Sequence, residues 1–233
     1  DFCLSRGLGD VYKRQEGFGI KHHLHTDRLL TLSEDLPLVS VAVDTRERIE
    51  AALADVDELR FDGLLTLERA RLIAGAPGPV ILAPELGEAA KLTVYVGRHQ
   101  RVDGRPAYEA VVALLHRHGM AGATVLLGVD GTARGARHRA RFFAANASVP
   151  VMVIAIGAGA AVAGLLPELG ALLPRPLLTL ERVRVCKRDG RILAEPDPLP
   201  DADPAGLGVW QKLMVHGDEQ ARAGAQPLHQ RLS

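Results

Sequence analysis

Hydrophobic residues recur along the chain with two spacings, one typical of strands and one typical of helices. Residues 91–97 (KLTVYVG) and 123–129 (ATVLLGV) alternate or run apolar over a short stretch, as buried strands do. Residues 105–119 have a proline near the first helical turn, repeat apolar positions at helical spacing and stop at a glycine. Residues 151–184 show strand, helix and strand spacing again. The pattern of residues 89–188 is therefore strand, helix, strand, loop, strand, helix, strand.

This order of elements predicts an α+β fold of the ferredoxin-like (split βαβ) type. In that arrangement four strands form an antiparallel sheet, and two helices pack together on one of its faces. The chain is thus expected to contain a two-layer unit of about 100 residues, which is an ordinary size for a domain.

Two stretches of the sequence are near-copies of each other. Residues 177–184 read LLTLERVR, and residues 64–71 read LLTLERAR, 113 positions earlier. An ungapped match that continues back through a helix and another strand indicates a tandem repeat. The offset of 113 aligns one strand and two polar residues of each copy: 38–43 with 151–156, His25 with His138, and Arg28 with Arg141.

A third copy begins near the C-terminus. Residues 212–215 (KLMV) match residues 91–94 (KLTV) at an offset of 121, which also places Pro227 on Pro106. Residues 194–206 are acidic and rich in proline, as linkers are. The chain is therefore expected to be a fragment of a longer tandem array.

These boundaries divide the chain into six segments. Residues 1–15 lack the apolar core and the cleavage site of a secretory signal, and we interpret them as a non-native or disordered leader. Because the first copy lacks a first strand, we expect residues 212–216 to insert antiparallel between residues 38–43 and 66–73. The expected segments are the leader 1–15, the C-terminal part of a first unit 16–74, a linker 75–88, a complete unit 89–188, a Pro-rich acidic linker 189–209, and the start of a further unit 210–233.

Composition and charge narrow the classes of function. The chain has 233 residues, and its 28 basic residues balance 28 acidic ones, so no net field recruits nucleic acid or an anionic membrane. No apolar run approaches the roughly 20 residues that span a bilayer, so we expect no direct membrane insertion. Two cysteines cannot build a disulfide framework, which favours a reducing compartment and a cytoplasmic location.

The complete unit resembles a known bacterial family. The segment KLTVYVGRHQRVDGRPAYEAVVALLHRHGMAGATVLLGVDG, the basic loop after it, and the runs SVPVMVIAI and LLTLERVRV are similar to the family catalogued as domain of unknown function 190. That family belongs with the nitrogen-regulatory PII-like proteins. The resemblance covers the whole second copy and the last two-thirds of the first copy.

The resemblance implies properties that residue patterns do not show. PII-like proteins are typically cytoplasmic trimers that sense small molecules, often nucleotides, between subunits. The resemblance thus implies a homo-oligomer, by analogy a trimer of units, with ATP, ADP or AMP as candidate ligands. Genes of this family often neighbour those of small fluoride channels, which implies signalling to a membrane transport protein. The family itself has no settled activity.

The loop GTARGARHRARFF at residues 131–143 is the candidate ligand site. It places five potential cations within eight residues, beside glycines that let backbone N–H groups converge on an anion. A helix starting near His138 would add its dipole. Binding of a phosphate-bearing ligand is one interpretation, and a solvated loop is the other. The candidate residues are Gly131, Arg134, Gly135, Arg137, His138 and Arg141.

Two further motifs resemble a metal site and a dinucleotide-binding turn, but neither has the residue spacing that such a site requires. Residues 21–25 (KHHLH) bring three histidines together, but no Cys, Asp or Glu with ligand spacing accompanies them, so we expect no metal. Residues 156–164 (IGAGAAVAG) imitate a dinucleotide-binding turn without its glycine spacing, and the first copy builds the same turn without glycine. No P-loop, nucleophile elbow or paired-carboxylate signature is present in the sequence, and no catalytic residue is assigned.

The sequence leaves two classes of function open. The first is a regulatory or sensor protein that binds a small anionic ligand, such as an adenine nucleotide, and signals to a membrane ion channel such as a fluoride channel. The second is an enzyme on the same scaffold with His138 as general base. Both remain open because ferredoxin-like scaffolds host many activities.

Overall fold

The chain divides into two compact units, Asp1–Arg182 and Val183–Ser233. Their structure comes from a computed structural model, which describes most of the complete repeat and shorter stretches elsewhere. The described residues are 8–13, 16–18, 24–26, 38–57, 66–74, 88–133, 136–139, 150–188, 191–194, 200–202, 212–216, 222–223 and 226–227.

The strands and helices of residues 89–182 follow the order that the sequence predicts. The short β7–β8 hairpin, Arg101–Val102 with Arg105–Pro106, connects the first strand to the first helix. The α+β class and the antiparallel sheet are thereby confirmed. The principal elements are β6 (Ala90–Gly97), α2 (Ala107–Arg117), β9 (Gly122–Ala133), β11 (Pro150–Gly157), α3 (Gly159–Leu172) and β12 (Leu177–Arg182).

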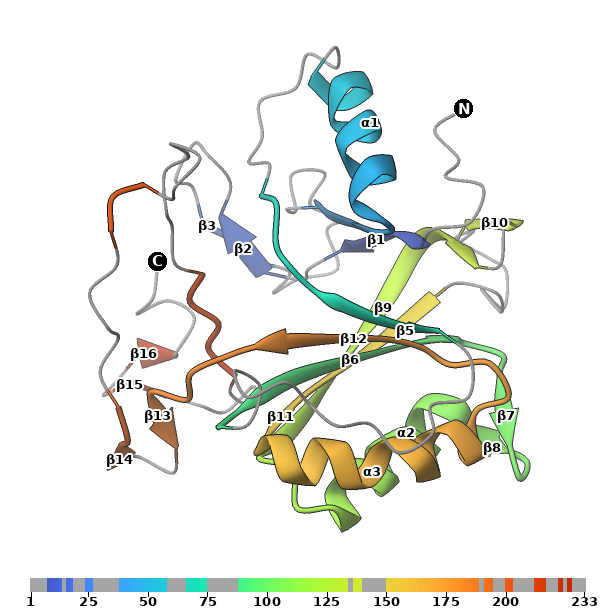
Figure 1. Ribbon diagram of the computed structural model, residues 1–233, viewed down its shortest axis with the longest axis vertical. Coiled ribbons are helices and arrows are strands. Elements are labelled where there is room, and N and C mark those ends of the chain that lie inside the picture. Colours follow the sequence, from blue (N-terminus) through green and yellow to red (C-terminus); the bar gives the residue numbers. More distant parts are fainter. Residues whose placement is uncertain are drawn as a thin grey trace. The chain divides into compact units, whose positions relative to one another are not determined.

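Helices α2 and α3 cover one face of the sheet, below the strands in Figure 1. Alternate residues of β6, β11 and β12 point to this face, as strand geometry requires, and they pack against apolar residues of both helices. Helix α2 stops before Gly119, whose φ of +66° favours glycine. The core is aliphatic: its buried members include Leu92, Val94, Val153 and Leu178 from the strands and Val111, Leu114, Leu115, Leu165, Leu166 and Leu169 from the helices.

The strand order of this part of the sheet is β9-β11-β6-β12, and each neighbouring pair is antiparallel. Numbered along the repeat, the order is two, three, one, four, which is compatible with a ferredoxin-like fold. The sheet does not end at these four strands. Within the described residues it contains eight strands, because the first copy adds three strands and β10 (Ala136–Arg139) pairs with β9.

Strands of the first copy extend the sheet at both ends. Strand β1 (Leu8–Lys13) pairs with β9 and with β4 (Leu38–Val43), and β5 (Arg71–Ala74) pairs with β12. The main order is thus β4-β1-β9-β11-β6-β12-β5. Helix α1 (Arg46–Asp57) follows β4, and a hydrogen bond from Arg46 to Glu50 raises the pKa of that arginine.

Two expectations for the first copy are wrong. Residues 8–13 of the expected leader form β1, because backbone groups at the edge of β4 need partners. The offset of 113 places β1 on residues 121–126, so it takes the position of a second strand. Residues 212–216 form no strand, so they do not insert as a strand between residues 38–43 and 66–73. The expected linker 75–88 lies outside the described residues except for Glu88.

The sheet curls so that one end strand reaches its centre. Val41 and Val43 of β4 pack against Tyr95, Met152 and Ile154, which lie on the face of β6 and β11 opposite the main core. Because β1 and β9 separate β4 from β11 in the pairing order, this contact requires strong curvature. The inner face of the curled sheet therefore holds a second, smaller apolar cluster.

The compact unit Val183–Ser233 contains two short hairpins within its described residues. At the offset of 121, its second hairpin corresponds to the β7–β8 hairpin, and the two hairpins have the same strand register. Arg222 lies opposite Pro227. The equivalent pair in the complete unit is Arg101 with Pro106. This agreement supports a third copy. The second strand of the other hairpin lies within residues 189–209, which were expected to be a linker. The hairpins are β13 (Lys187–Arg188) with β14 (Arg191–Ile192), and β15 (Arg222–Ala223) with β16 (Gln226–Pro227).

In the part of the chain that the structure describes, each helix is too short or too polar to span a bilayer. Among the described residues the longest helix, α3, spans 14 residues, whereas a bilayer needs about 20.

Gly128 of β9 is a position where the sheet has no room for a side chain. A Cβ atom there would lie 2.8 Å from the carbonyl oxygen of Pro150 and 2.9 Å from its Cγ atom. We expect Gly128→Ala to lower the free energy of unfolding by about 1–3 kcal/mol, as overpacking does. Gly122→Ala on the same strand is the matched control, because a Cβ atom there meets nothing within 4 Å. Equal denaturation midpoints for the two variants would contradict this prediction.

Candidate functional site

The predicted ligand loop begins as a β-hairpin and not as a loop that leads into a helix. Residues 131–133 end β9, and β10 (Ala136–Arg139) runs antiparallel to them. The expected helix start near His138 is therefore wrong, because His138 lies in β10. Pairing across the hairpin satisfies backbone groups that a helix would otherwise have to satisfy.

The hairpin brings three of the predicted site residues onto facing strands. His138 lies opposite Gly131, and Arg137 lies opposite Thr132. Gly131 also pairs with Asp10 of β1, so it has a strand on each side. Outside the described residues lie the other three predicted site residues, Arg134, Gly135 and Arg141.

The first copy contains a hairpin at the corresponding place. Strands β2 (Glu16–Phe18) and β3 (Leu24–Thr26) are antiparallel, and His25 lies opposite Gly17. His25 is the counterpart of His138 at the offset of 113. In each copy, a histidine on the second strand of a hairpin thus lies opposite a glycine on the first strand, although the offset of 113 aligns Gly17 with Asp130 and not with Gly131. The other two histidines of the KHHLH motif lie outside the described residues.

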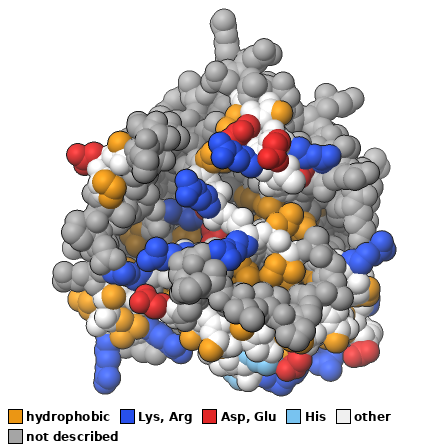
Figure 2. Space-filling view, in the orientation of Figure 1, with side chains coloured by type: hydrophobic (Ala, Val, Ile, Leu, Met, Phe, Trp, Pro, Cys, Tyr) orange, Lys and Arg blue, Asp and Glu red, His pale blue; other side chains and the backbone are white. Residues whose placement is uncertain are grey.

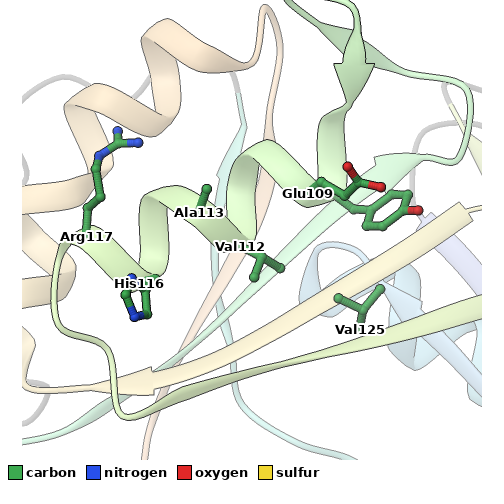
Figure 3. Close-up of a pocket in the computed structure, with 7 residues that line it drawn as sticks. Glu109, Val112, Ala113, His116, Arg117 and Val125 are labelled. Atoms are coloured by element: carbon green, nitrogen blue, oxygen red, sulfur yellow. The ribbon is translucent and has the colours of Figure 1, made fainter.

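A groove runs along α2, away from the hairpin. Val112 and Val125 give it an apolar floor, and both are half-buried. Figure 3 shows Val112 and His116 pointing from α2 toward the strands, whereas Ala113 and Arg117 point toward the other side of the helix. The groove has a volume of about 750 Å³ and is lined by Tyr108, Glu109, Val112, Ala113, His116, Arg117 and Val125.

Arg117, at the rim of this groove, forms an ion pair with Glu168 of α3. Its guanidinium lies 3.5 Å from one carboxylate oxygen of Glu168, and Nε2 of His118 lies 2.9 Å from the other. The Arg117–Glu168 pair is largely exposed, so it contributes at most about 1 kcal/mol to stability. Its effect is to restrict Arg117, which also borders a smaller hollow of about 230 Å³ between α2 and the β7–β8 hairpin.

The groove and the hairpin are separate features of β9. Val125 and Gly131 lie six residues apart along this strand, which corresponds to about 20 Å. The groove combines an apolar floor with one carboxylate, one imidazole and one guanidinium, an arrangement that can bind a mixed apolar and charged ligand. Among the described residues, no group of three or more His, Cys, Asp or Glu side chains could hold a metal ion.

Sequence reasoning missed the groove. Its signal in the sequence is faint: Val112 and Ala113 lie outside the buried stripe of α2, between the charged residues of the exposed face. Isolated apolar residues on a helix surface are common and do not identify a site by themselves. Only the position of Val125 on β9, beside α2, makes Val112 part of the floor of a groove.

The fold and the repeated hairpins define a tandem α+β protein in which each copy presents a histidine across from a glycine. A family model described as "Uncharacterized ACR", the DUF190 family, matches residues 8–72 and 89–185. The chain belongs to this family. The two matched segments correspond to the first copy and to the complete unit, and the match confirms the resemblance seen in the sequence.

Proposed function

We propose that this chain is a PII-like regulatory or sensor protein that binds a small anionic ligand, such as ATP, ADP or AMP, at the β9–β10 hairpin. One observation carries the proposal: His138 faces Gly131 in the complete unit, as His25 faces Gly17 in the first copy. A glycine lets an anion approach the backbone closely, and an imidazole can become a cation near neutral pH. Arg137, next to His138, adds a permanent positive charge.

The proposal includes the finer architecture of residues 89–188 as a PII-like unit, with four strands and two helices on one face. The order β9-β11-β6-β12 supports this assignment. Units of this kind would assemble as a homo-oligomer in the cytoplasm and signal to a membrane transport protein, such as a fluoride channel. These last elements rest on the resemblance to the PII-like proteins.

Arg137→Ala combined with Arg141→Ala is expected to weaken nucleotide binding at least about tenfold. Hydrogen bonds to charged groups contribute about 1.5–3 kcal/mol each, so the loss of two guanidinium groups should be easy to detect. Titration calorimetry of the full chain with ATP, ADP and AMP measures the affinity, and thermal denaturation checks that the variant folds.

The matched control removes the same charge elsewhere. Arg98→Ala with Arg175→Ala changes two exposed arginines outside the hairpin and should bind nucleotide as the parent does. If the parent binds none of the three nucleotides, or if the hairpin variant binds as tightly as the parent, the hairpin is not the site. Sustained hydrolysis of a bound nucleotide would instead favour an enzyme.

A further inference from the structure

Two leucines are exposed in this chain where the complete unit buries their counterparts. Leu180 of β12 lies opposite Leu92 of β6, and these residues are 2% and 0% exposed. The repeat offsets place Leu67 on Leu180 and Leu213 on Leu92. Leu67 is 67% exposed and Leu213 is 79% exposed. Figure 2 shows exposed hydrophobic side chains among Lys and Arg side chains on one face of the protein.

The first copy holds no described strand at the place that β6 fills in the complete unit. Strand β6 lies between β11 and β12 and pairs with both. The counterpart of β11 is β4, which ends the strand order within the described residues. The counterpart of β12 is residues 64–69, of which 66–69 form no strand. Edges of this kind accept an added strand through backbone hydrogen bonds.

Residues 212–216 have the features of the strand that would fit. They read KLMVH, they form no strand, and all five are exposed. Their sequence repeats the start of β6, and the β15–β16 hairpin follows them as β7–β8 follows β6, in the same register. The segment is therefore the equivalent of β6 in the third copy.

The charges of the two segments are complementary. In the complete unit, Nζ of Lys91 lies 2.5 Å from Oε2 of Glu181, and the two residues are opposite each other on β6 and β12. The counterparts of this pair are Lys212 and Glu68. The register that places Leu213 opposite Leu67 thus also places a lysine opposite a glutamate.

We propose that residues 212–216 of a second copy of this chain add as a strand between β4 and residues 66–70. Among the described residues, each chain carries this donor and this acceptor, so two chains that exchange them form a closed twofold dimer. Residues 193–211, which follow the β13–β14 hairpin, can span up to about 65 Å when extended, which is enough to reach a neighbouring chain. The exchange buries the two exposed leucines and adds ladder hydrogen bonds between the two segments.

A charge-reversal mixture tests the exchange between chains. Glu68→Lys and Lys212→Glu each place like charges opposite each other, so each variant alone should dimerise at least about tenfold more weakly than the parent. An equimolar mixture of the two variants restores opposite charges at both exchange sites and should form heterodimers with nearly the affinity of the parent. Sedimentation velocity over a range of concentrations measures each dissociation constant.

Matched control variants and a cross-linking measurement distinguish a lost strand exchange from a general effect of the substitutions on folding. Glu88→Lys and Lys187→Glu change the same charges at other exposed positions and should dimerise as the parent does. With Cys3 and Cys186 replaced by serine, a mixture of Leu67→Cys and Leu213→Cys chains should form a disulfide-linked pair under mild oxidation, whereas neither chain alone should. A monomeric parent, a mixture no stronger than its components, or no cross-link in the mixture would overturn the proposal.

Discussion

Replacing Leu166 by alanine is expected to lower the free energy of unfolding of the compact unit Asp1–Arg182 by about 2–5 kcal/mol. Leu166 lies on α3, is 0% exposed, and belongs to the aliphatic core between the helices and the sheet. The substitution removes apolar surface from this core and leaves a cavity that neighbours on β6 and α2 fill only in part. Denaturant titration followed by circular dichroism measures the loss.

The repeat supplies a matched control for this substitution. Leu53 on α1 is the counterpart of Leu166 at the offset of 113, and it is only half-buried. Leu53→Ala should therefore cost less than half as much, although the residue type and the helix position are the same. Equal losses for the two variants would show that the core does not lie where the structure places it.

The shared octet shows what a sequence pattern predicts and what it leaves open. Alternation in LLTLERVR predicts a strand, and residues 177–182 form β12. The same alternation in LLTLERAR predicts a strand from residue 64, but residues 66–70 form none, and β5 begins only at Arg71. The letters are nearly identical, so the difference comes from the neighbours. Strand β12 has β6 beside it, and the first copy has no described equivalent.

The hairpin at the predicted ligand site shows a second kind of feature that residue patterns do not predict. Basic residues and glycines carry no apolar alternation, so residues 131–139 gave no strand signal and suggested a loop with a helix behind it. In the structure, β9 continues as far as Ala133, and β10 (Ala136–Arg139) pairs back on it. The residue types of the candidate site could be predicted, whereas the pairing that places His138 opposite Gly131 could not.

Pairing between the two copies also lay beyond the sequence. Periodicity identifies β6, β9, β11 and β12 one at a time, and the ferredoxin-like order follows from known topological preferences. Nothing in the spacing of residues shows that β1 will pair with β9, or β5 with β12. These contacts depend on open edges in the folded sheet. The expectation that residues 1–15 lie outside the fold failed at residues 8–13 for this reason.

Replacing Lys91 by alanine is expected to lower the free energy of unfolding by about 3–5 kcal/mol. The side chains of Lys91 and Glu181 are 7% and 15% exposed, and they form an ion pair between neighbouring strands. Removing the lysine leaves the carboxylate of Glu181 nearly buried without this cation. The hydroxyl of Thr179, buried two residues away on β12, already lacks a hydrogen-bond partner in the structure.

A variant that replaces both Lys91 and Glu181 separates two effects: the lost attraction between the charges, and the cost of burying one charge without its ion-pair partner. Lys91→Met with Glu181→Leu replaces both charges with apolar groups of similar size, and its stability should be close to that of the parent or higher. Glu181→Leu alone should resemble Lys91→Ala, because it removes the carboxylate with which Lys91 forms its ion pair. A double-mutant cycle from urea denaturation gives the coupling free energy. If the double variant is as unstable as the single ones, the pair contributes net stability, and its counterpart Lys212–Glu68 would strengthen a strand exchange more than a charge match alone implies.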